Sequence, residues 1–249
     1  MVNFRKFYKD KANIAYIVMG YPNLDMSVKF IKRLDECNID ILEVGVPYSD
    51  PIADGEIIAN AASKALENGT TIHKILEKLE KIETNKALVF MAYYNLIFAY
   101  GLKAFVKAAK KAGICGLIVP ELSYEESSDL KKECDKEGLA LITFISLTTP
   151  KERIAKLCKN ANGFIYLLAS IGLTGGKSSR NELLVNKIEE IRAYTKLPIF
   201  VGFGIKNYED VEKIHKISDG AIVGTSIVNE FQNENIDEVI KNVKEIFKK

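Results

Sequence analysis

Short apolar segments alternate along the whole chain with longer segments of helical spacing. The short segments are rich in Val, Ile and Phe, as β-strands are, and in the longer ones apolar residues recur every three or four positions. The pattern predicts eight strands, near Ile14 to Met19, Ile41 to Val46, Ala87 to Ala92, Gly116 to Val119, Ala140 to Ile145, Gly163 to Leu168, Pro198 to Gly202 and Gly220 to Val223. Helices are predicted between them, for example at Leu102 to Ala112, Tyr124 to Glu137, Glu182 to Tyr194 and Ile236 to Phe247.

Eight repeats of strand and helix favour a single (β/α)8 TIM barrel. Several predicted strands are apolar on both faces, as expected when helices cover one side and a packed interior the other. A doubly wound open sheet also gives repeated strand and helix units, but no dinucleotide-binding glycine motif follows the first strand. Periodicity alone leaves closure of the sheet open. No Gly, Ser or Pro-rich linker interrupts the alternation, so we expect one domain over residues 1–249.

Composition and charge exclude several classes of function. The 249 residues are 47% hydrophobic and 27% charged, which is typical of a folded globular domain. The formal net charge is only +2 and no basic block is present, so nothing suggests nucleic-acid binding. No apolar run reaches the roughly 20 residues needed to span a bilayer, and the N-terminus lacks the apolar centre of a signal peptide. We expect a cytoplasmic protein that does not bind membranes.

The cysteines and histidines do not suggest a metal site. The four cysteines are widely spaced and form no CxxC pair, which argues against zinc and against a disulfide framework. His73 and His215 each stand alone in a Lys-rich helical stretch, so we interpret both as solvated helix residues. A metal-dependent mechanism is therefore disfavoured.

Glu43 is the most unusual residue of the predicted strands. It lies within a run of Leu, Val and Ile that must be buried, where a carboxylate is costly unless it has a partner or a task. Burial should raise its pKa toward a value useful for proton transfer. A structural ion pair is the alternative, but the predicted strand cores contain hardly any Lys or Arg, which favours catalysis.

Asp54 follows eleven residues later, in a loop whose Asp50, Pro51 and Gly55 indicate tight turns. An Asp-Gly pair is usually only a turn. In a barrel, however, this loop lies at the C-terminal end of a strand, where active sites are built, and it can place Asp54 opposite Glu43. Two carboxylates in unlike environments are the arrangement that separates an acid from a base, so this pair predicts an acid-base enzyme.

Glycines gather after the last three predicted strands and predict a phosphate site. They are Gly172, Gly175 and Gly176, then Gly202 and Gly204, then Gly224, which Thr225 and Ser226 follow. Such residues let backbone N–H groups close around an oxyanion, and the seventh and eighth loops are the usual phosphate site of barrels. Ordinary turns are the alternative for any one loop. Lys177 lies in a loop instead of an apolar pocket, which disfavours imine catalysis.

From about Ile14 onward the chain resembles the tryptophan synthase alpha chain family. The stretch Leu42 to Gly55, LEVGVPYSDPIADG, is similar to the family signature that carries two catalytic acids, which fall on Glu43 and Asp54. Further similar segments are MGYP at Met19 to Pro22, YYNLIFAYG at Tyr93 to Gly101, YLLASIGLTG at Tyr166 to Gly175, VGFGI at Val201 to Ile205 and GTSIV at Gly224 to Val228.

The resemblance implies roles for further residues. Tyr16, Met91, Tyr93 and Phe203 would line an indole pocket, Tyr166 would lie beside the reacting carbons, and Thr174 would belong to a sixth loop that closes and orients Asp54. The phosphate would bind at Gly175, Gly204, Gly224 and Thr225. Departures from the family pattern include Tyr48 in place of Phe, Glu56 where Pro is common and PELSYEE in the fourth loop.

The resemblance also implies the reaction and the partner. The reaction would be retro-aldol cleavage of indole-3-glycerol phosphate to indole and glyceraldehyde 3-phosphate, without a metal or cofactor in this chain. A beta chain carrying pyridoxal phosphate would bind in an alpha2beta2 assembly, contacting the loop Pro47 to Asp54 and the region of Asn95. Another phosphosugar barrel, such as an isomerase, an epimerase or indole-glycerol phosphate synthase, and a binding subunit without chemistry are the alternatives. The synthase would need a strand Lys, and intact Glu43 and Asp54 argue against a mere binding subunit.

Overall fold

The computed structural model describes residues 2–169, 177–202 and 204–248. Within them, nine parallel strands form one sheet in the order β5-β4-β3-β2-β1-β9-β8-β7-β6. The strands are β1 (Ala12–Val18), β2 (Ile41–Gly45), β3 (Ala87–Met91), β4 (Ile114–Ile118), β5 (Ala140–Leu141), β6 (Thr143–Ser146), β7 (Ile165–Leu168), β8 (Ile199–Gly202) and β9 (Gly220–Val223). All eight predicted strands are present, with ends that differ by one or two residues.

The ends of the sheet meet within the fifth predicted strand, which is divided into β5 and β6. Only Ile142 separates the two pieces. β5 pairs with β4 and β6 pairs with β7, while the Ile142 N–H donates to the Leu117 carbonyl oxygen at 2.9 Å. The same stretch of chain therefore completes the ring from both sides. The closed TIM barrel is confirmed over the open doubly wound sheet.

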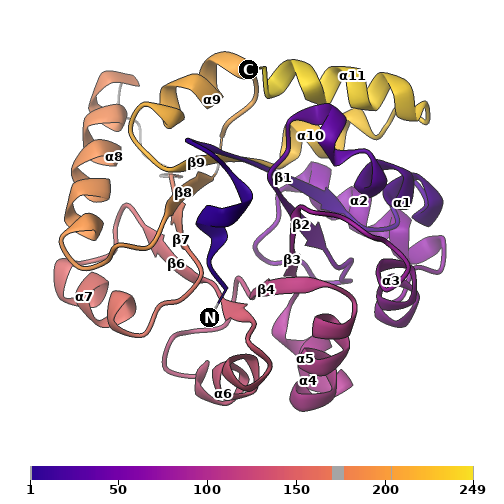
Figure 1. Ribbon diagram of the computed structural model, residues 1–249, viewed down its shortest axis with the longest axis horizontal. Helices are drawn as coiled ribbons and strands as arrows, with labels where there is room; N and C mark the ends of the chain where they lie inside the picture. The colour runs from indigo at the N-terminus through magenta and orange to yellow at the C-terminus, as the bar shows by residue number, and fades with distance from the viewer. Residues whose placement is uncertain (1, 170–176, 203, 249) are drawn as a thin grey trace.

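Helices surround the barrel (Figure 1). They are α1 (Leu24–Lys32), α2 (Glu56–Glu67), α3 (Ile72–Leu79), α4 (Tyr94–Tyr100), α5 (Leu102–Lys111), α6 (Ser128–Glu137), α7 (Lys151–Lys159), α8 (Lys177–Arg192), α9 (Tyr208–His215), α10 (Thr225–Glu230) and α11 (Ile236–Ile246), with short 3-10 turns η1 (Phe4–Phe7) and η2 (Leu34–Cys37). Side-chain caps fix several starts: Asn23, Thr71, Asn207 and Asn235 each accept a backbone N–H of the first turn.

Two kinds of core hold the barrel together. One fills the barrel interior and contains, among others, Ile14, Val89, Phe164 and Phe200. The other lies between the sheet and the surrounding helices, where strand residues such as Leu42 pack against helix residues. Because strand side chains alternate between these two cores, both faces of a strand are apolar, as the sequence indicated.

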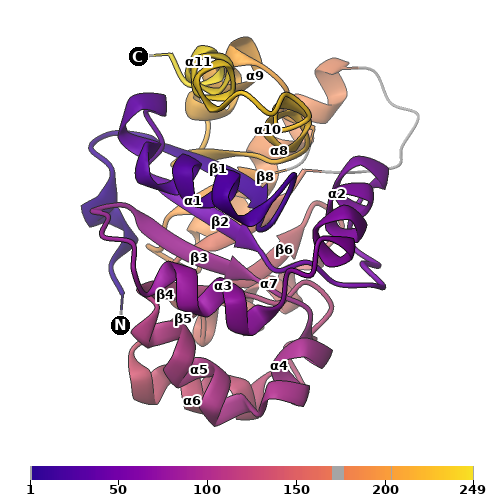
Figure 2. The same ribbon diagram turned by 90° about the vertical axis from the view of Figure 1, so that its right-hand side faces the viewer.

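The N-terminal segment closes the bottom of the barrel, a feature that the apolar pattern of the sequence does not predict. In Figure 1 this segment crosses the centre of the ring, and Figure 2 shows it at the opposite end of the barrel from α2. Phe4 is fully buried in the interior core, and its ring meets that of Phe164 edge-on at 5.1 Å between centroids. The ring of Tyr8 likewise meets that of Phe200 at 5.8 Å.

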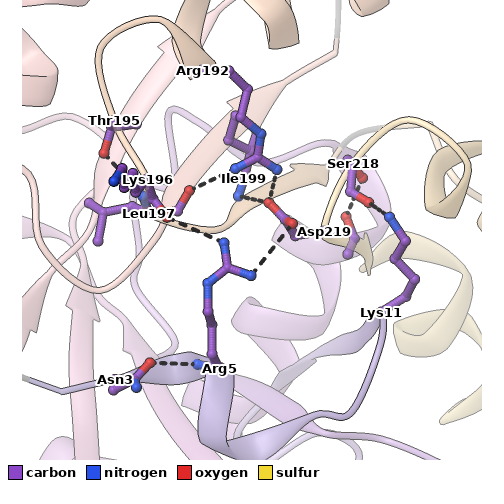
Figure 3. A network of polar contacts seen from close by, with 11 residues as sticks. Asn3, Arg5, Lys11, Arg192, Thr195, Lys196, Leu197, Ile199, Ser218 and Asp219 are labelled. Atoms are coloured by element: carbon purple, nitrogen blue, oxygen red, sulfur yellow. Dashed lines mark hydrogen bonds and ion pairs between the residues drawn. The ribbon is translucent and has the colours of Figure 1, made fainter.

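Polar contacts hold this segment to the ends of the late strands (Figure 3). Asp219 accepts hydrogen bonds from the Arg192 guanidinium and from the Ile199 N–H, the latter at 2.8 Å. Arg5 approaches Asp219 at 3.9 Å and donates to the Lys196 carbonyl oxygen at 3.3 Å. The network lies at the N-terminal ends of strands, away from the face where barrels place their active sites.

Three local predictions were wrong. The helix predicted from Tyr124 begins at Ser128, after a turn in which the Ser127 hydroxyl donates to the Tyr124 carbonyl oxygen. Lys177 is not part of a loop: it is the first residue of α8, which begins five residues before the predicted start at Glu182. His215 is half-buried and not fully solvated: its Nε2 lies 3.2 Å from the Ala12 carbonyl oxygen, and burial lowers its pKa.

Candidate active site

Glu43 occupies the middle of β2 and is completely buried. Its strand neighbours are Tyr16 of β1 and Val89 of β3. Within the described part of the chain neither carboxylate oxygen has a hydrogen-bond partner, so the structural ion pair considered from the sequence is absent there. Burial alone raises the pKa of Glu43 to about 8. A carboxyl group with such a pKa is mostly protonated at neutral pH and can both give and accept a proton.

Two tyrosines stand beside Glu43 in the barrel. Tyr16 and Tyr166 are 6% and 8% exposed, and each hydroxyl lies over a glycine of the neighbouring strand. A Cβ on Gly45 would come within 2.4 Å of the Tyr16 hydroxyl, and one on Gly202 within 2.5 Å of the Tyr166 hydroxyl. Burial, first, and then the charges of Asp54 and Glu43 raise the pKa of both phenols well above 10. The two tyrosines and the two carboxylates therefore share one region.

Asp54 lies in the loop between β2 and α2 and is partly buried. The Tyr93 hydroxyl donates to its Oδ2 at 3.0 Å, and the same hydroxyl accepts the Ala53 N–H at 3.0 Å. Burial raises the pKa of Asp54, and the hydrogen bond from Tyr93 partly offsets that rise. A hydrogen bond therefore holds the Asp54 carboxylate in place, and Asp54 is more exposed to solvent than Glu43. The sequence predicted this difference in environment between the two carboxylates.

Met91 and the aromatic side chains complete the wall near Glu43. Met91 ends β3 opposite Gly45 and packs, half-buried, against the cluster that contains Tyr16. The ring of Phe144, on β6, lies 4.9 Å from that of Tyr166. Beyond Phe144 a hollow of about 440 Å³ opens between the loop after β4 and the loop after β6, lined also by Val119 and Leu168. Apolar side chains such as Phe144 and Leu168 and polar ones such as Ser146 and Arg153 both line this hollow.

The glycines predicted to bind phosphate follow two adjacent strands. Gly204 lies just after β8 with φ of +79°, a left-handed conformation that favours glycine. Gly224 follows β9 and lies beside Tyr16, with a would-be Cβ 3.6 Å from the Tyr16 Cβ. Thr225 is exposed and begins α10, so backbone N–H groups of that first turn are free of helical partners. Both loops end on the same face as Glu43 and Asp54.

A sequence model of the family described as "Tryptophan synthase alpha chain" matches residues 4–249. The chain belongs to the tryptophan synthase alpha chain family. A tryptophan synthase alpha chain from Campylobacter jejuni subsp. doylei is 64% identical over 249 residues, which are all of both chains. Another, from Methanocaldococcus jannaschii, is 41% identical over 222 residues, 88% of this chain and 79% of the relative.

Solved tryptophan synthase structures agree with this assignment. The structure of tryptophan synthase subunit alpha from Campylobacter jejuni has a TM-score of 0.96 at 63% identity, covering 99% of this chain and 100% of that one. A chain of the aminoacrylate-bound tryptophan synthase from M. tuberculosis has a TM-score of 0.84 at 30% identity, covering 95% and 92%. Membership confirms the resemblance drawn from the sequence motifs.

The alpha chain fold brings together most of the residues predicted for the site. Tyr16, Glu43 and Tyr166 lie in the barrel, and Tyr93 holds Asp54 at its mouth. Thr174, Gly175 and Phe203, along with Gly172 and Gly176, lie outside the described residues. Among the residues that are described, no group of three or more His, Cys, Asp or Glu side chains is placed to hold a metal ion.

Two residues near the alpha chain site were not assigned to it from the sequence. Phe144 could have been found from the alternation of its strand, because Thr143 and Ile145 point to the opposite face. Tyr48 was noted only as a departure from the family pattern. Its ring stacks on that of Tyr93 at 5.0 Å and 27°, a contact between separate loops that sequence spacing does not reveal.

Proposed function

We propose that this chain cleaves indole-3-glycerol phosphate to indole and glyceraldehyde 3-phosphate, the lyase reaction of its family, with Glu43 and Asp54 as the acting carboxylates. The observation that carries the proposal is the carboxylate of Glu43, fully buried and unpartnered among the described residues beside two tyrosines. A buried polar group without a hydrogen-bond partner is costly to keep unless it has a task. We also propose that residues 1–249 form one barrel domain.

Glu43 serves the two protons of the cleavage. In its protonated form it gives a proton to indole C3, which produces an indolenine. It then accepts the proton of the hydroxyl on the adjacent glycerol carbon. As that O–H bond breaks, a C=O bond forms, the bond to C3 breaks and its electron pair restores the indole ring. The raised pKa of Glu43, about 8, suits a group that must do both near neutral pH.

Asp54 accepts the indole N–H and stabilises the positive charge of the indolenine. The hydrogen bond from the Tyr93 hydroxyl orients one carboxylate oxygen, which leaves the other available to the substrate. Partial burial of Asp54 strengthens this electrostatic contribution, because less water screens the charge.

The remaining predicted residues bind the substrate. Tyr16, Met91 and Tyr93 line the indole pocket together with Phe203, and Tyr166 lies beside the reacting carbons. Backbone N–H groups at Gly175, Gly204, Gly224 and Thr225 bind the phosphate, while Thr174 belongs to a loop that closes over the substrate. The close approach of Gly224 to Tyr16 supports this arrangement, because it joins the phosphate loop to the indole pocket.

The chain acts with a beta chain that carries pyridoxal phosphate, in an alpha2beta2 assembly, and receives no cofactor of its own. Ile52 and Phe98 are 79% and 64% exposed, on the loop that carries Asp54 and on α4. The loop and α4 are joined by the hydrogen bond between Asn95 and Tyr48, and exposed large apolar residues on neighbouring elements are typical of protein interfaces. We propose a cytoplasmic location for the chain. No helix among the described residues is long and apolar enough to cross a membrane.

The proposal is tested with the purified chain and indole-3-glycerol phosphate, following indole and glyceraldehyde 3-phosphate together. We expect equal amounts of the two products, formed faster when a beta chain is added. Thr225→Asp, which places a negative charge at the phosphate site, should raise KM by at least about tenfold with little loss of stability. A chain that binds the substrate without releasing indole would contradict the proposal, as would a Thr225→Asp variant with an unchanged KM.

A further inference from the structure

A hydrogen bond ties the loop that carries Asp54 to the start of α4. The Nδ2 of Asn95, in the first turn of α4, donates to the Tyr48 hydroxyl at 3.2 Å. Tyr48 belongs to the loop between β2 and α2, and Phe at this position would have no hydroxyl to accept the bond. The α4 end of this contact is itself anchored, because the Tyr94 N–H donates to the Glu121 carboxylate of the loop after β4.

The ring of Tyr48 lies flat against the residue that holds Asp54. It stacks on the Tyr93 ring at 5.0 Å between centroids and 27° between planes. Tyr93 is only 5% exposed and its hydroxyl bonds both the Ala53 N–H and the Asp54 carboxylate. Contacts therefore run without a break from Asn95 through Tyr48 and Tyr93 to Asp54.

We infer that Tyr48 is a positioning residue for Asp54. Its hydroxyl fixes the stacked Tyr48 ring against Tyr93, and Tyr93 in turn holds Asp54. The inference rests on the proposed function, since it concerns reaction rate only if Asp54 acts on the substrate. A stacked pair by itself restrains the two rings only weakly, because the ring contact adds little energy beyond burial of the rings. The bond to Asn95 removes that freedom at the outer end, so the Tyr93 hydroxyl stays directed at Asp54.

We expect loss of the Tyr48 hydroxyl to lower kcat and to leave substrate binding unchanged. Tyr48 is half-buried and Asn95 is exposed, whereas Tyr93 is buried, so both lie nearer the surface than the residue that contacts Asp54. Loss of the hydroxyl would let the loop populate arrangements in which Asp54 points elsewhere. The fraction of competent chains then falls while the phosphate loops after β8 and β9 are unchanged.

The test is a cycle of Tyr48→Phe, Asn95→Ala and the double variant, measured for indole release by the chain alone. We expect kcat to fall about fivefold in each single variant, as for loss of one partly exposed hydrogen bond, with KM within about twofold. The double variant should be no slower than either single one. Tyr194→Phe, an equally conservative change at a 39% exposed site after α8, should match the unaltered chain.

Asp54→Asn, measured in parallel, separates this inference from the function on which it rests. If Asp54→Asn is inactive and Tyr48→Phe has unaltered kcat, the positioning role is wrong and the proposed function stands. Independent, multiplying losses in the double variant would also overturn the inference, because the two residues would then not act through one contact. Full activity of Asp54→Asn would overturn both. Should one single variant fail to fold, the other still measures the loss of the same hydrogen bond.

Discussion

The Glu43 carboxyl is shielded from water, and its burial makes the stability of the folded chain depend on pH. Its carboxyl has a pKa of about 8 in the folded chain, against 4.5 when exposed. Between these values the folded chain carries a proton that the unfolded chain has released. The folded state therefore binds more protons, and this group makes stability fall as pH rises from about 4.5 to about 8.

We expect Glu43→Gln to remove this dependence. Relative to the unaltered chain, the variant should become more stable as pH rises from 5 to 8, by at most about 1.4 kcal/mol per pH unit and a few kcal/mol in all. Urea unfolding of both chains at pH 5, 6.5 and 8 measures the difference, in which the contributions of other groups cancel. A difference that does not change with pH would show that Glu43 is ionised in the folded chain at every pH used.

At the scale of single residues, the sequence predicted the two site residues that differ in kind from their neighbours along the chain. Glu43 stands out because the residues around it in the strand are apolar, and Asp54 because turn-forming residues surround it. The partners of Asp54 are different in kind. Tyr93 and Tyr48 reach it from separate loops, and such contacts follow from the folded arrangement and not from spacing along the chain.

Pairs of strands share a packing device in which a tyrosine lies over a glycine of its neighbour. Tyr16 of β1 covers Gly45 of β2, and Tyr166 of β7 covers Gly202 of β8. Any side chain at the glycine would displace the ring, so the two elements position the tyrosine jointly. The glycines at these strand ends thus support the site wall as well as the turns that follow.

We expect Gly202→Ala to impair indole release at least about tenfold while costing about 1 to 3 kcal/mol of stability, because the added methyl overlaps the Tyr166 ring. The would-be Cβ lies 2.6 Å from Tyr166 Cε1. Gly55→Ala is the matched control for stability, since a Cβ there meets no atom within 4 Å. Kinetics and thermal unfolding check both variants. Unaltered activity in Gly202→Ala would mean that the Tyr166 ring position is unimportant.

Among the larger elements, the strands and the long helices could be predicted from the sequence, because each buries a regular face. The 3-10 segment Phe4–Phe7 could not, since it is too short for a period to be recognised. The division of the fifth strand at Ile142 was also hidden, because its apolar pattern continues through the break. Both features close the barrel, and the periodicity left closure undecided. The Phe4–Phe7 segment fills the bottom of the barrel, and the strand divided at Ile142 joins the two ends of the sheet.

Phe4→Ala tests the first of these features. We expect a loss of about 3 to 5 kcal/mol in the free energy of unfolding, as for a fully buried ring that leaves a cavity. Indole release at 25 °C should stay within about twofold, because the N-terminal segment that carries Phe4 lies at the opposite end of the barrel from α2, which follows the loop with Asp54. Denaturant unfolding and steady-state kinetics provide the two readouts. A variant as stable as the unaltered chain would show that the segment does not complete the core.

At the scale of the whole molecule, one face carries both the candidate active site and solvent-exposed apolar residues. The loop with Ile52 carries Asp54, and α4 with Phe98 carries Asn95. A partner that covers this face would act on the elements that hold Asp54. If Asp54 is correctly placed in about 1% of free chains and in nearly all bound ones, binding raises activity about a hundredfold without a new catalytic group.

Phe98→Glu should separate partner binding from chemistry. We expect the affinity for a beta chain to fall at least about tenfold, because a charge replaces a large apolar contact, with unaltered indole release by the chain alone. Leu183→Glu on α8, which changes a residue that is 50% exposed, is the control and should bind normally. Titration of each variant with the beta chain gives both quantities. Equal affinity in Phe98→Glu would place the interface elsewhere.

The central claim is that the buried carboxyl of Glu43 moves the protons of carbon–carbon bond cleavage. The most direct measurement is indole release by Glu43→Gln at saturating indole-3-glycerol phosphate, with substrate affinity determined separately. The amide keeps the shape of the side chain but cannot exchange the proton. We expect kcat to fall by about a thousandfold or more while the substrate Kd changes by no more than a few fold. Turnover within about tenfold of the unaltered chain would contradict the claim.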